Sequence, residues 1–448
     1  MGLSWRNIVV VVGLSFGLGA IAASHEIILE KLGQATNAFA SLNVSDRDDP
    51  GDNKSSPQTA SLLEASQTVF PRDHTMPQRG DVRVVVISDL NGPYRSTTYS
   101  QEVINSIRAI PEWEPDLVLS AGDMVAGQLM SLTPEDLQGL WQGFEQQIFQ
   151  PIRQAGIPFA FTLGHHDGSA IVQPENRVKP QPPLQDPSSH IPAGDYIFAQ
   201  ERAAAQAYWT ASDRDLGLDL SMASNFPFRY SFVHAGIFFL VWDASTAELD
   251  ETALKWAEQQ LSSPAAQQAK MRISLGHFPL YAISQGRDRP GEFLNQGDAI
   301  RRLLETYDVH THISGHHHAY YPGRVGELDL LYSGALGVGP RSLLGTDDPA
   351  QRTLTVMDIF FDASEAPDVW NPEGEENDTA QSRRGQRPPD ESERMATVYT
   401  TYNMATLEMI EPTSLPRVVA GPTGLVLRQD MNRRDLTYQD NLRYVRSW

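Results

Sequence analysis

Five short motifs place Asp, Asn or His directly after a hydrophobic run, with glycine close to the polar residue. They are Ser-Asp-Leu-Asn-Gly at 88–92, Gly-Asp-Met at 122–124, Gly-His-His-Asp at 164–167, Gly-His-Phe-Pro at 276–279 and Gly-His-His-His at 315–318. Asp and His are the ligands that a pair of divalent cations prefers, and the glycines would let the backbone turn sharply beside them. One such motif is a weak signal, because Gly-Asp is common in turns and single histidines often have structural roles. Five in order indicate a metal site.

The hydrophobic runs before these motifs alternate with amphipathic stretches, as in an α/β protein whose sheets are covered by helices. Strands are predicted at 82–88, 117–121, 158–163, 237–242, 272–275 and 310–314, with late strands near 398–402 and 424–427. Helices are predicted at 99–110, 134–155, 199–214, 252–261 and 298–307. Because open α/β sheets bind ligands beyond the carboxyl ends of their strands, the five motifs are expected to meet in one crevice.

The order of these motifs resembles that of the calcineurin-like metallophosphoesterases, whose blocks read Asp-x-His, Gly-Asp, Gly-Asn-His-Asp/Glu, Gly-His and Gly-His-x-His. The resemblance covers about residues 82–340, and the third and fifth blocks are its most specific part. It implies an α/β fold in which a sandwich of two mixed sheets is flanked by helices. It also implies a hydrolase acting on phosphoric ester bonds, with a dinuclear metal centre at the strand ends.

The resemblance assigns metal ligands residue by residue. Asp89 and His318 would bind the first metal, and His277 and His316 would bind the second. Asp123 would bridge the two. The implied cofactors are two divalent or mixed-valence metal ions, such as Mn, Fe, Zn or Ca. They would activate a water for in-line attack on phosphorus, so no protein nucleophile is needed.

The third block also supplies the expected catalytic pair. His166 matches the family histidine that contacts the leaving-group oxygen, and Asp167 would orient its imidazole. Two further residues, one near the first block and one within the fifth, have weaker expected roles. Arg95 either clamps a substrate phosphate or lies in a surface loop. His317 alternates away from its neighbours if the segment is extended, so it is expected behind the site or at the surface.

Two positions depart from the family pattern. Asn91 stands where most members have His, and His165 stands where they have Asn. Asn91 would ligate through its amide oxygen or leave a position open for water, whereas His165 would ligate through nitrogen. We therefore expect an active site with an altered metal preference. The alternative is a degenerate site that binds one metal or none.

Three interpretations of function follow. The first is a metal-dependent phosphomonoesterase, and the second is a phosphodiesterase, since two-metal sites serve both reactions. The third is a catalytically inactive exported binding protein on the same fold, which would bind phosphate ligands without turnover. Bound metals with turnover would distinguish the enzymes from the binding protein. The sequence does not determine the natural substrate or the oligomeric state.

Composition restricts the partners of the chain. Its 448 residues carry a formal net charge of −21, so the overall field repels nucleic acid and anionic membrane surfaces. No nucleic-acid binding is expected, and the expected partner is a small phosphoester substrate attracted by bound cations. The chain has no cysteine, which excludes both a disulfide framework and a lipid-modified N-terminal Cys.

The N-terminal residues have the pattern of an export signal. Arg6 precedes an apolar run at 8–23, and small residues at 20–22 have cleavage-site spacing. Because the run is short for a membrane-spanning helix, residues 1–23 are interpreted as a cleaved signal peptide or, alternatively, as an uncleaved anchor that would be the chain's only membrane contact. We therefore expect an exported protein, periplasmic or secreted.

The remaining chain divides into a linker and a domain. Residues 24–80 are predicted to form a spacer helix and a disordered linker, because their Ser, Pro, Asp and Gln content cannot bury enough apolar area to fold. Residues 81–448 are predicted to form one metallophosphoesterase domain that includes the C-terminal strands. Irregular inserts are predicted at 173–192 and near 367–392, which break the alternation of strands and helices.

Overall fold

The computed structural model describes residues 69, 76–173, 196–220, 225–369, 395–437 and 440. All of them belong to Gln67–Trp448, the larger of two compact units of the chain. The predictions for the export signal, for most of the linker and for most of both inserts fall outside the described residues. Within the described part of the chain, no helix is both long and apolar enough to cross a membrane.

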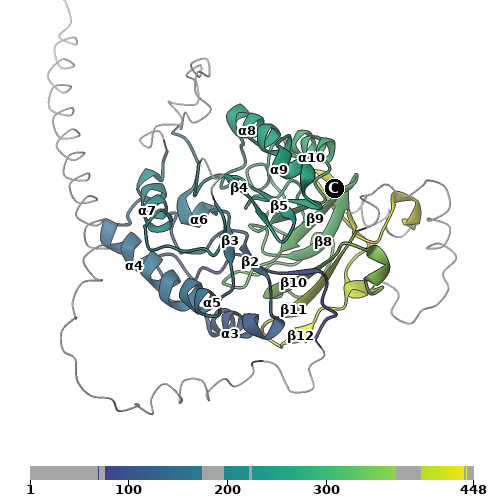
Figure 1. Cartoon of the computed structure of the whole chain (residues 1–448), viewed down its shortest axis with the longest axis horizontal. Coiled ribbons are helices and arrows are strands. Elements are labelled where there is room, and N and C mark those ends of the chain that lie inside the picture. The colour runs from purple at the N-terminus through teal and green to yellow at the C-terminus, as the bar shows by residue number, and fades with distance from the viewer. Residues whose placement is uncertain are drawn as a thin grey trace, which may run out of the picture. The chain divides into compact units, whose positions relative to one another are not determined.

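Two β-sheets form the centre of this unit (Figure 1). The first runs in the order β12-β11-β10-β1-β2-β3, with β1 (Val82–Ile87), β2 (Leu117–Ser120), β3 (Phe159–Phe161), β10 (Thr353–Phe360), β11 (Ala396–Asn403) and β12 (Glu408–Met409). The second runs in the order β13-β14-β8-β9-β7-β6-β5-β4, with β4 (Tyr230–His234), β5 (Ile237–Val241), β6 (Met271–Leu275), β7 (Thr311–Ser314), β8 (Tyr320–Val325), β9 (Leu328–Ser333), β13 (Val418–Gly421) and β14 (Gly424–Arg428).

Both sheets are mixed: parallel strands form one half of the first sheet and the centre of the second. In the first sheet β1, β2 and β3 are parallel neighbours, while β10 pairs antiparallel with both β1 and β11. In the second, β5, β6, β7 and β9 are parallel, and β4, β8, β13 and β14 are joined by antiparallel pairs. Parallel neighbours end at the same edge of a sheet, so the loops after β1, β2 and β3 lie together, as do those after β6 and β7.

Apolar side chains fill three layers between and outside the sheets. Alternation along β1 shows this: Val84 and Val86 pack between the sheets, whereas Val85 and Ile87 face the helices. The outer face of the first sheet is covered by α3 (Gln101–Ala109), α4 (Pro134–Phe144) and α7 (Ala199–Trp209), and that of the second by α8 (Glu251–Leu261), α9 (Pro264–Gln268) and α10 (Gly297–Thr306). The predicted two-sheet α/β sandwich is confirmed.

The predicted elements are found with adjusted ends. The helix expected at 134–155 consists of α4, a π-helical turn at Glu145–Phe149 and α5 (Gln150–Gln154). Pro151 lacks the N–H that an unbroken α-helix would require at this point, and the π turn lies just before it. The helix expected at 199–214 ends at Trp209. The two late strands are confirmed as β11 and β14, which belong to different sheets.

Candidate metal centre

The candidate ligands lie on loops that follow five of the strands. Asp89 and Asn91 follow β1, Asp123 follows β2, and His165 and His166 open the short helix α6 (His165–Gly168) after β3. The others follow strands of the second sheet: His277 comes after β6, and His316 and His318 come after β7. The two sheets thus bring distant residues together, since the backbone N–H of His316 donates to the Asp89 carboxylate across 227 positions.

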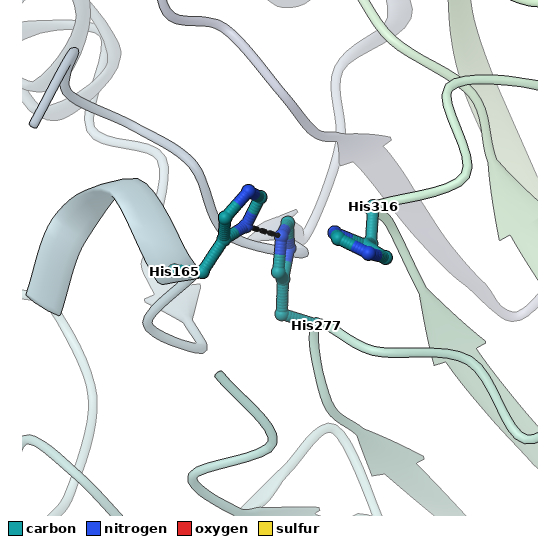
Figure 2. A group of neighbouring side chains, drawn as sticks. All are labelled: His165, His277 and His316. Carbon is teal, nitrogen blue, oxygen red and sulfur yellow. Dashed lines mark hydrogen bonds between the residues drawn. The ribbon is translucent and has the colours of Figure 1, made fainter. Parts of the chain in front are cut away.

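Asp123 lies at the centre of the cluster. Its Oδ2 is 3.0 Å from Nδ1 of His165 and 3.2 Å from Nε2 of His277. These two ring nitrogens are 2.9 Å apart, and Figure 2 shows both rings side by side with the ring of His316. Nδ1 of His277 donates to the Ala121 carbonyl at 2.8 Å, which leaves Nε2 to face Asp123. Lone-pair atoms this close together are typical of a cation site.

Asp89 and His318 form a second close contact between a carboxylate oxygen and a ring nitrogen. Nε2 of His318 lies 3.1 Å from Oδ1 of Asp89. Nδ1 of His318 donates to the Gly339 carbonyl at 2.8 Å, so Nε2 is the ring nitrogen that faces Asp89. The other carboxylate oxygen of Asp89 accepts from Ser88 Oγ and from the backbone of His316. Asp89 and His318 are therefore oriented with one lone-pair atom each directed at a shared point.

Three overlapping groups in the described residues have donor atoms close enough for one metal ion. They are His165, His277 and His316; Asp123, His165 and His166; and Asp89, Asp123 and His318, with the donor atoms of each group within 4.8 Å of one another. Asp123 belongs to two of the groups, as a bridging ligand would. His316 is stacked on Phe278 with the ring centroids 3.7 Å apart, which fixes the plane of its ring.

Buried atoms without a hydrogen-bond partner show that these residues fit metal ions. The orphaned atoms on the candidate ligands are Asp89 Oδ1, Asn91 Oδ1, Asp123 Oδ2, His316 Nδ1 and His318 Nε2. A buried polar atom left without a partner costs about 1–3 kcal/mol, so five on one set of candidate ligands would be a large penalty. All five can offer a lone pair, and carboxylate, amide and imidazole donors together suit divalent cations.

The backbone is strained where the ligands lie. Asp89, Asp123, His316 and His318 all have positive φ, between 51° and 61°, a region that non-glycine residues rarely adopt. Such residues cost about 1–3 kcal/mol each and persist only where the surroundings hold them. The chain therefore places four candidate ligands in conformations that local sequence preference opposes.

Two of the glycines beside the ligands allow a neighbouring loop to pack closely and do not make a sharp backbone turn. Gly122 has φ 96°, as the expected sharp turn requires. At Gly164, however, an added Cβ would lie 2.1 Å from Asp123 Oδ1, and at Gly315 it would lie 2.1 Å from Ser88 Oγ. Neither Gly164 nor Gly315 has positive φ. The sequence-based explanation of these two glycines is corrected: they leave room for the neighbouring loop.

Electrostatics favour positive charge at the centre of the cluster. Burial opposes ionisation of Asp123, but attraction to His165 and His277 outweighs it and holds the Asp123 pKa well below its usual value. Burial lowers the pKa of His165 to about 4, so this ring is neutral near pH 7. For His277, burial is outweighed by Asp123, and the pKa rises to about 9. The carboxylate therefore favours a cation at this point, either a proton on His277 or a metal ion.

His166 presents one ring nitrogen to the site. Its Nδ1 donates to the Gly127 carbonyl at 3.1 Å, and the Gly127 N–H donates back to the His166 carbonyl at 3.1 Å. Nε2 is consequently the free nitrogen, and it lies 4.0 Å from Asp123 Oδ2. The side chain is 13 % exposed, whereas that of His277 is fully buried, so His166 is open to a molecule arriving from solvent.

Asp167 does not orient His166 directly, contrary to the expectation from the sequence. Its carboxylate accepts from three backbone N–H groups, of Met124, Val125 and Gly164, at 2.8 to 2.9 Å. Burial and the nearby Asp123 raise its pKa to about 7, although the backbone donors act against this. Asp167 thus joins the loops after β2 and β3, because its oxygens satisfy backbone donors that would otherwise be buried without partners.

Arg95 and His317, the two residues with weaker expected roles, lie outside the ligand cluster. Arg95 donates to the carbonyl and hydroxyl of Ser131 at 2.7 and 2.9 Å, which favours the surface-loop interpretation over a phosphate clamp. His317 is buried behind the site. Its Nδ1 accepts from the Ile283 N–H at 3.2 Å, and its Nε2 donates to the Glu292 carbonyl at 3.0 Å. His317 therefore supports the loop that carries its neighbours.

Two residues of α7 that the motifs do not reveal hold the His166 segment. Glu201 accepts from the backbone N–H groups of Gln128 and Leu129 at 2.8 and 2.9 Å, next to Gly127. Arg202 donates to the Gly168 carbonyl at 2.8 Å and pairs with Asp243 at 2.6 Å. Nothing in the pattern of this alanine-rich helix marks these charges as buried, so only their tertiary contacts reveal them.

The chain belongs to the calcineurin-like phosphoesterase family, whose sequence profile matches residues 82–320 and includes all five blocks. The expected resemblance is confirmed. Among solved structures, the chain is similar to the purple acid phosphatase PPD1 from yellow lupin (Lupinus luteus) seeds, at 14% identity and TM-score 0.42 over 74% of this chain and 52% of that one. The chain thus spans about half the length of the lupin enzyme.

Two other solved structures are also similar. GAP50, the anchor in the inner membrane complex of Plasmodium, has 11% identity and TM-score 0.43 over 82% of this chain and 94% of its own. A dimetal phosphatase from Danio rerio has 12% identity and TM-score 0.39 over 63% of this chain and 94% of its own. A search of curated proteins found no match.

Proposed function

We propose that this chain is a metal-dependent phosphoester hydrolase with a dinuclear metal centre. The observation that carries the proposal is the cluster of ligand-type side chains that five loops bring together around Asp123, on three of which buried lone-pair atoms have no hydrogen-bond partner. Membership of the calcineurin-like phosphoesterase family supports the same chemistry. A structural role alone would not require so many orphaned acceptors in one place.

The donor groups suggest how two ions would be held. Asp89, Asp123 and His318 would hold the first. His277 and His316 would hold the second together with Asp123, whose Oδ2 is 3.2 Å from Nε2 of His277. His165 would add a nitrogen donor to the second, and the buried amide oxygen of Asn91 is a further donor. When bound, the two cations would neutralise phosphoryl oxygens and lower the pKa of a water that attacks phosphorus.

His166 has the geometry for the leaving-group side of the reaction. Because its Nδ1–H is held by the Gly127 carbonyl, Nε2 is the atom that faces an entering substrate. Through Nε2 it would stabilise or protonate the departing oxygen. The loops after β2 and β3, joined by Asp167, would keep this nitrogen beside Asp123.

The test is release of p-nitrophenol from its phosphate monoester and its bis-ester by the full chain, with Mn, Zn, Fe, Ca or Mg supplied. Metal-dependent turnover is expected in the wild type and in Asp213→Asn, which removes an exposed carboxylate, but not in Asp123→Asn. The ratio of the two rates gives the monoester or diester preference. Bound metal without turnover on either ester would support the inactive binding protein instead, and fewer than about one metal per chain with every ion would overturn the dinuclear centre.

We also propose that the protein is exported, on the apolar run at 8–23 alone. Cell fractionation followed by N-terminal sequencing tests this. A mature N-terminus after the small residues at 20–22 would show cleavage, and an intact N-terminus in the membrane fraction would show an anchor. Recovery of the intact protein in the cytoplasm would contradict export.

A further inference from the structure

A carboxylate outside the five blocks contacts the fifth block. Glu292 lies on the loop between β6 and α10, and its Oε2 is 3.2 Å from Nε2 of His316. The carbonyl of the same residue accepts from Nε2 of His317 at 3.0 Å. Glu292 therefore contacts two consecutive histidines, one of them a candidate metal ligand.

Arg287 holds Glu292 in this position. Its Nη1 is 2.6 Å from Glu292 Oε2, and both side chains are only 16 % exposed, so the ion pair is well shielded from water. Arg289 adds a longer contact to the other oxygen, at 3.3 Å. Nη1 of Arg287 is also 3.1 Å from Nε2 of His316. Nε2 of His316 therefore has both a donor, Arg287, and an acceptor, Glu292, beside it.

The two tautomers of His316 are not equivalent in this setting. If Nε2 accepted from Arg287, the ring proton would sit on Nδ1, which is buried and has no partner. A buried donor without an acceptor is disfavoured. If Nε2–H donates to Glu292, the orphaned Nδ1 is a lone pair, the form that a metal ion binds.

We infer that Glu292 is a positioning residue that selects the tautomer of His316 with a proton on Nε2 and a free lone pair on Nδ1. Glu292 acts through His316 and does not belong to the groups of donor atoms close enough for one metal ion in the described residues. Carboxylates placed behind metal-binding histidines fix the ring and increase the basicity of the ligating nitrogen. The inference rests on the proposed function, because it assigns His316 to the second metal ion.

Metal titration of the metal-free full chain tests the inference. Zn or Mn binding is measured calorimetrically for wild type, Glu292→Ala, Glu292→Gln and Asp288→Asn, the last an exposed carboxylate on the same loop. Glu292→Ala should weaken one of the two binding steps about 10- to 100-fold and leave the other unchanged. Glu292→Gln, which keeps an acceptor oxygen, should fall between Glu292→Ala and wild type, and Asp288→Asn should match wild type. Two unchanged binding steps in Glu292→Ala would overturn the inference.

Nitrogen-15 NMR of the histidine rings tests the tautomer without any metal. The His316 signals are identified by their absence from His316→Gln. Wild type and Asp288→Asn should show His316 protonated on Nε2, and Glu292→Ala should show a mixture of tautomers. Protonation of Nδ1 in the wild type would overturn the inference. If the wild type binds no metal but shows the expected tautomer, the proposed function fails while the effect of Glu292 on the ring stands.

Discussion

Nδ1 of His165 lies 3.0 Å from Oδ2 of Asp123, so a nitrogen donor stands where the family pattern has an asparagine. The ring is buried and neutral near pH 7, because burial lowers its pKa to about 4. Its lone pair is therefore available without loss of a proton. This contact supports His165 as a candidate metal ligand rather than as a sign of a degenerate site. It also determines the effect expected when His165 is replaced.

His165→Asn should shift metal preference rather than abolish activity. The variant exchanges a nitrogen donor for a harder amide oxygen, which favours Mn and Mg over Zn. We expect the ratio of Zn- to Mn-supported kcat/KM to fall on the order of tenfold, equivalent to about 1.4 kcal/mol. Steady-state rates with each metal measure this ratio. If it did not change, His165 would not be a ligand.

His166→Ala should lower kcat in a manner that depends on the leaving group. An alkyl phosphate needs a proton as its oxygen departs, so we expect a loss of about 100- to 10,000-fold, with a much smaller loss for p-nitrophenyl phosphate. Metal content should stay unchanged. His234→Ala, at the end of β4 beside the Asp116 carbonyl, is the matched control. Equal losses on both esters would argue against a role at the leaving group.

Arg83→Met should destabilise the fold strongly. Arg83 and Asp358 join β1 to β10 through a bidentate ion pair at 2.8 and 3.0 Å, with 4 % and 0 % of their side chains exposed. Removing one partner leaves a buried charge, which costs about 3–5 kcal/mol. Arg79→Met, which breaks the exposed pair with Asp116, should cost less than about 1 kcal/mol. Urea unfolding of both variants measures the difference, and similar losses would contradict the prediction.

Glu201→Gln should change how stability depends on pH. Burial raises the pKa of Glu201 from 4.5 to about 7, although the backbone donors at Gln128 and Leu129 oppose this. The folded state therefore keeps a proton that the unfolded state has lost, and stability from this group falls as pH rises from about 4.5 to about 7. Gln does not titrate, so the stability of wild type relative to the variant should decline by about 1 to 3 kcal/mol across this window.

Urea unfolding of wild type and Glu201→Gln at pH 4.5, 6 and 8 measures this decline, because other titrating groups cancel in the difference between the two proteins. A difference that stays constant, or that rises with pH, would show that Glu201 is ionised normally in the folded state.

The ligand blocks and the strands that carry them could be predicted from the sequence because both are local patterns. Hydrophobic runs are visible within ten residues and predict β1, β2, β3, β5, β6 and β7, of which all but β5 are followed by one of the five blocks. Strands β4, β8, β9, β10, β12 and β13 were not predicted. β10 is buried along its whole length although Thr353, Thr355 and Asp358 are polar, so its sequence lacks the continuous apolar run that marks β5.

Contacts between distant loops were the part that the sequence could not reveal. The family resemblance implies that Asp167 orients His166, its immediate neighbour, but the folded chain satisfies that carboxylate with the N–H groups of Met124 and Val125. The same applies to Gly315, whose missing Cβ leaves room for Ser88. Neither relationship has a signal in the sequence, because it depends on how two strands far apart in the chain are placed.

The sequence by itself determined the α/β class, because this depends on short-range periodicity, and the order of its five motifs carried the resemblance that implies the family and the candidate ligands. Only the tertiary structure decided which lone pairs face one another, which ligands carry strained backbone, and that Glu292 and Glu201 lie behind the site. Hydrogen-bond direction and burial depend on distances between separate elements of the fold, and those distances are set only when the two sheets pack together.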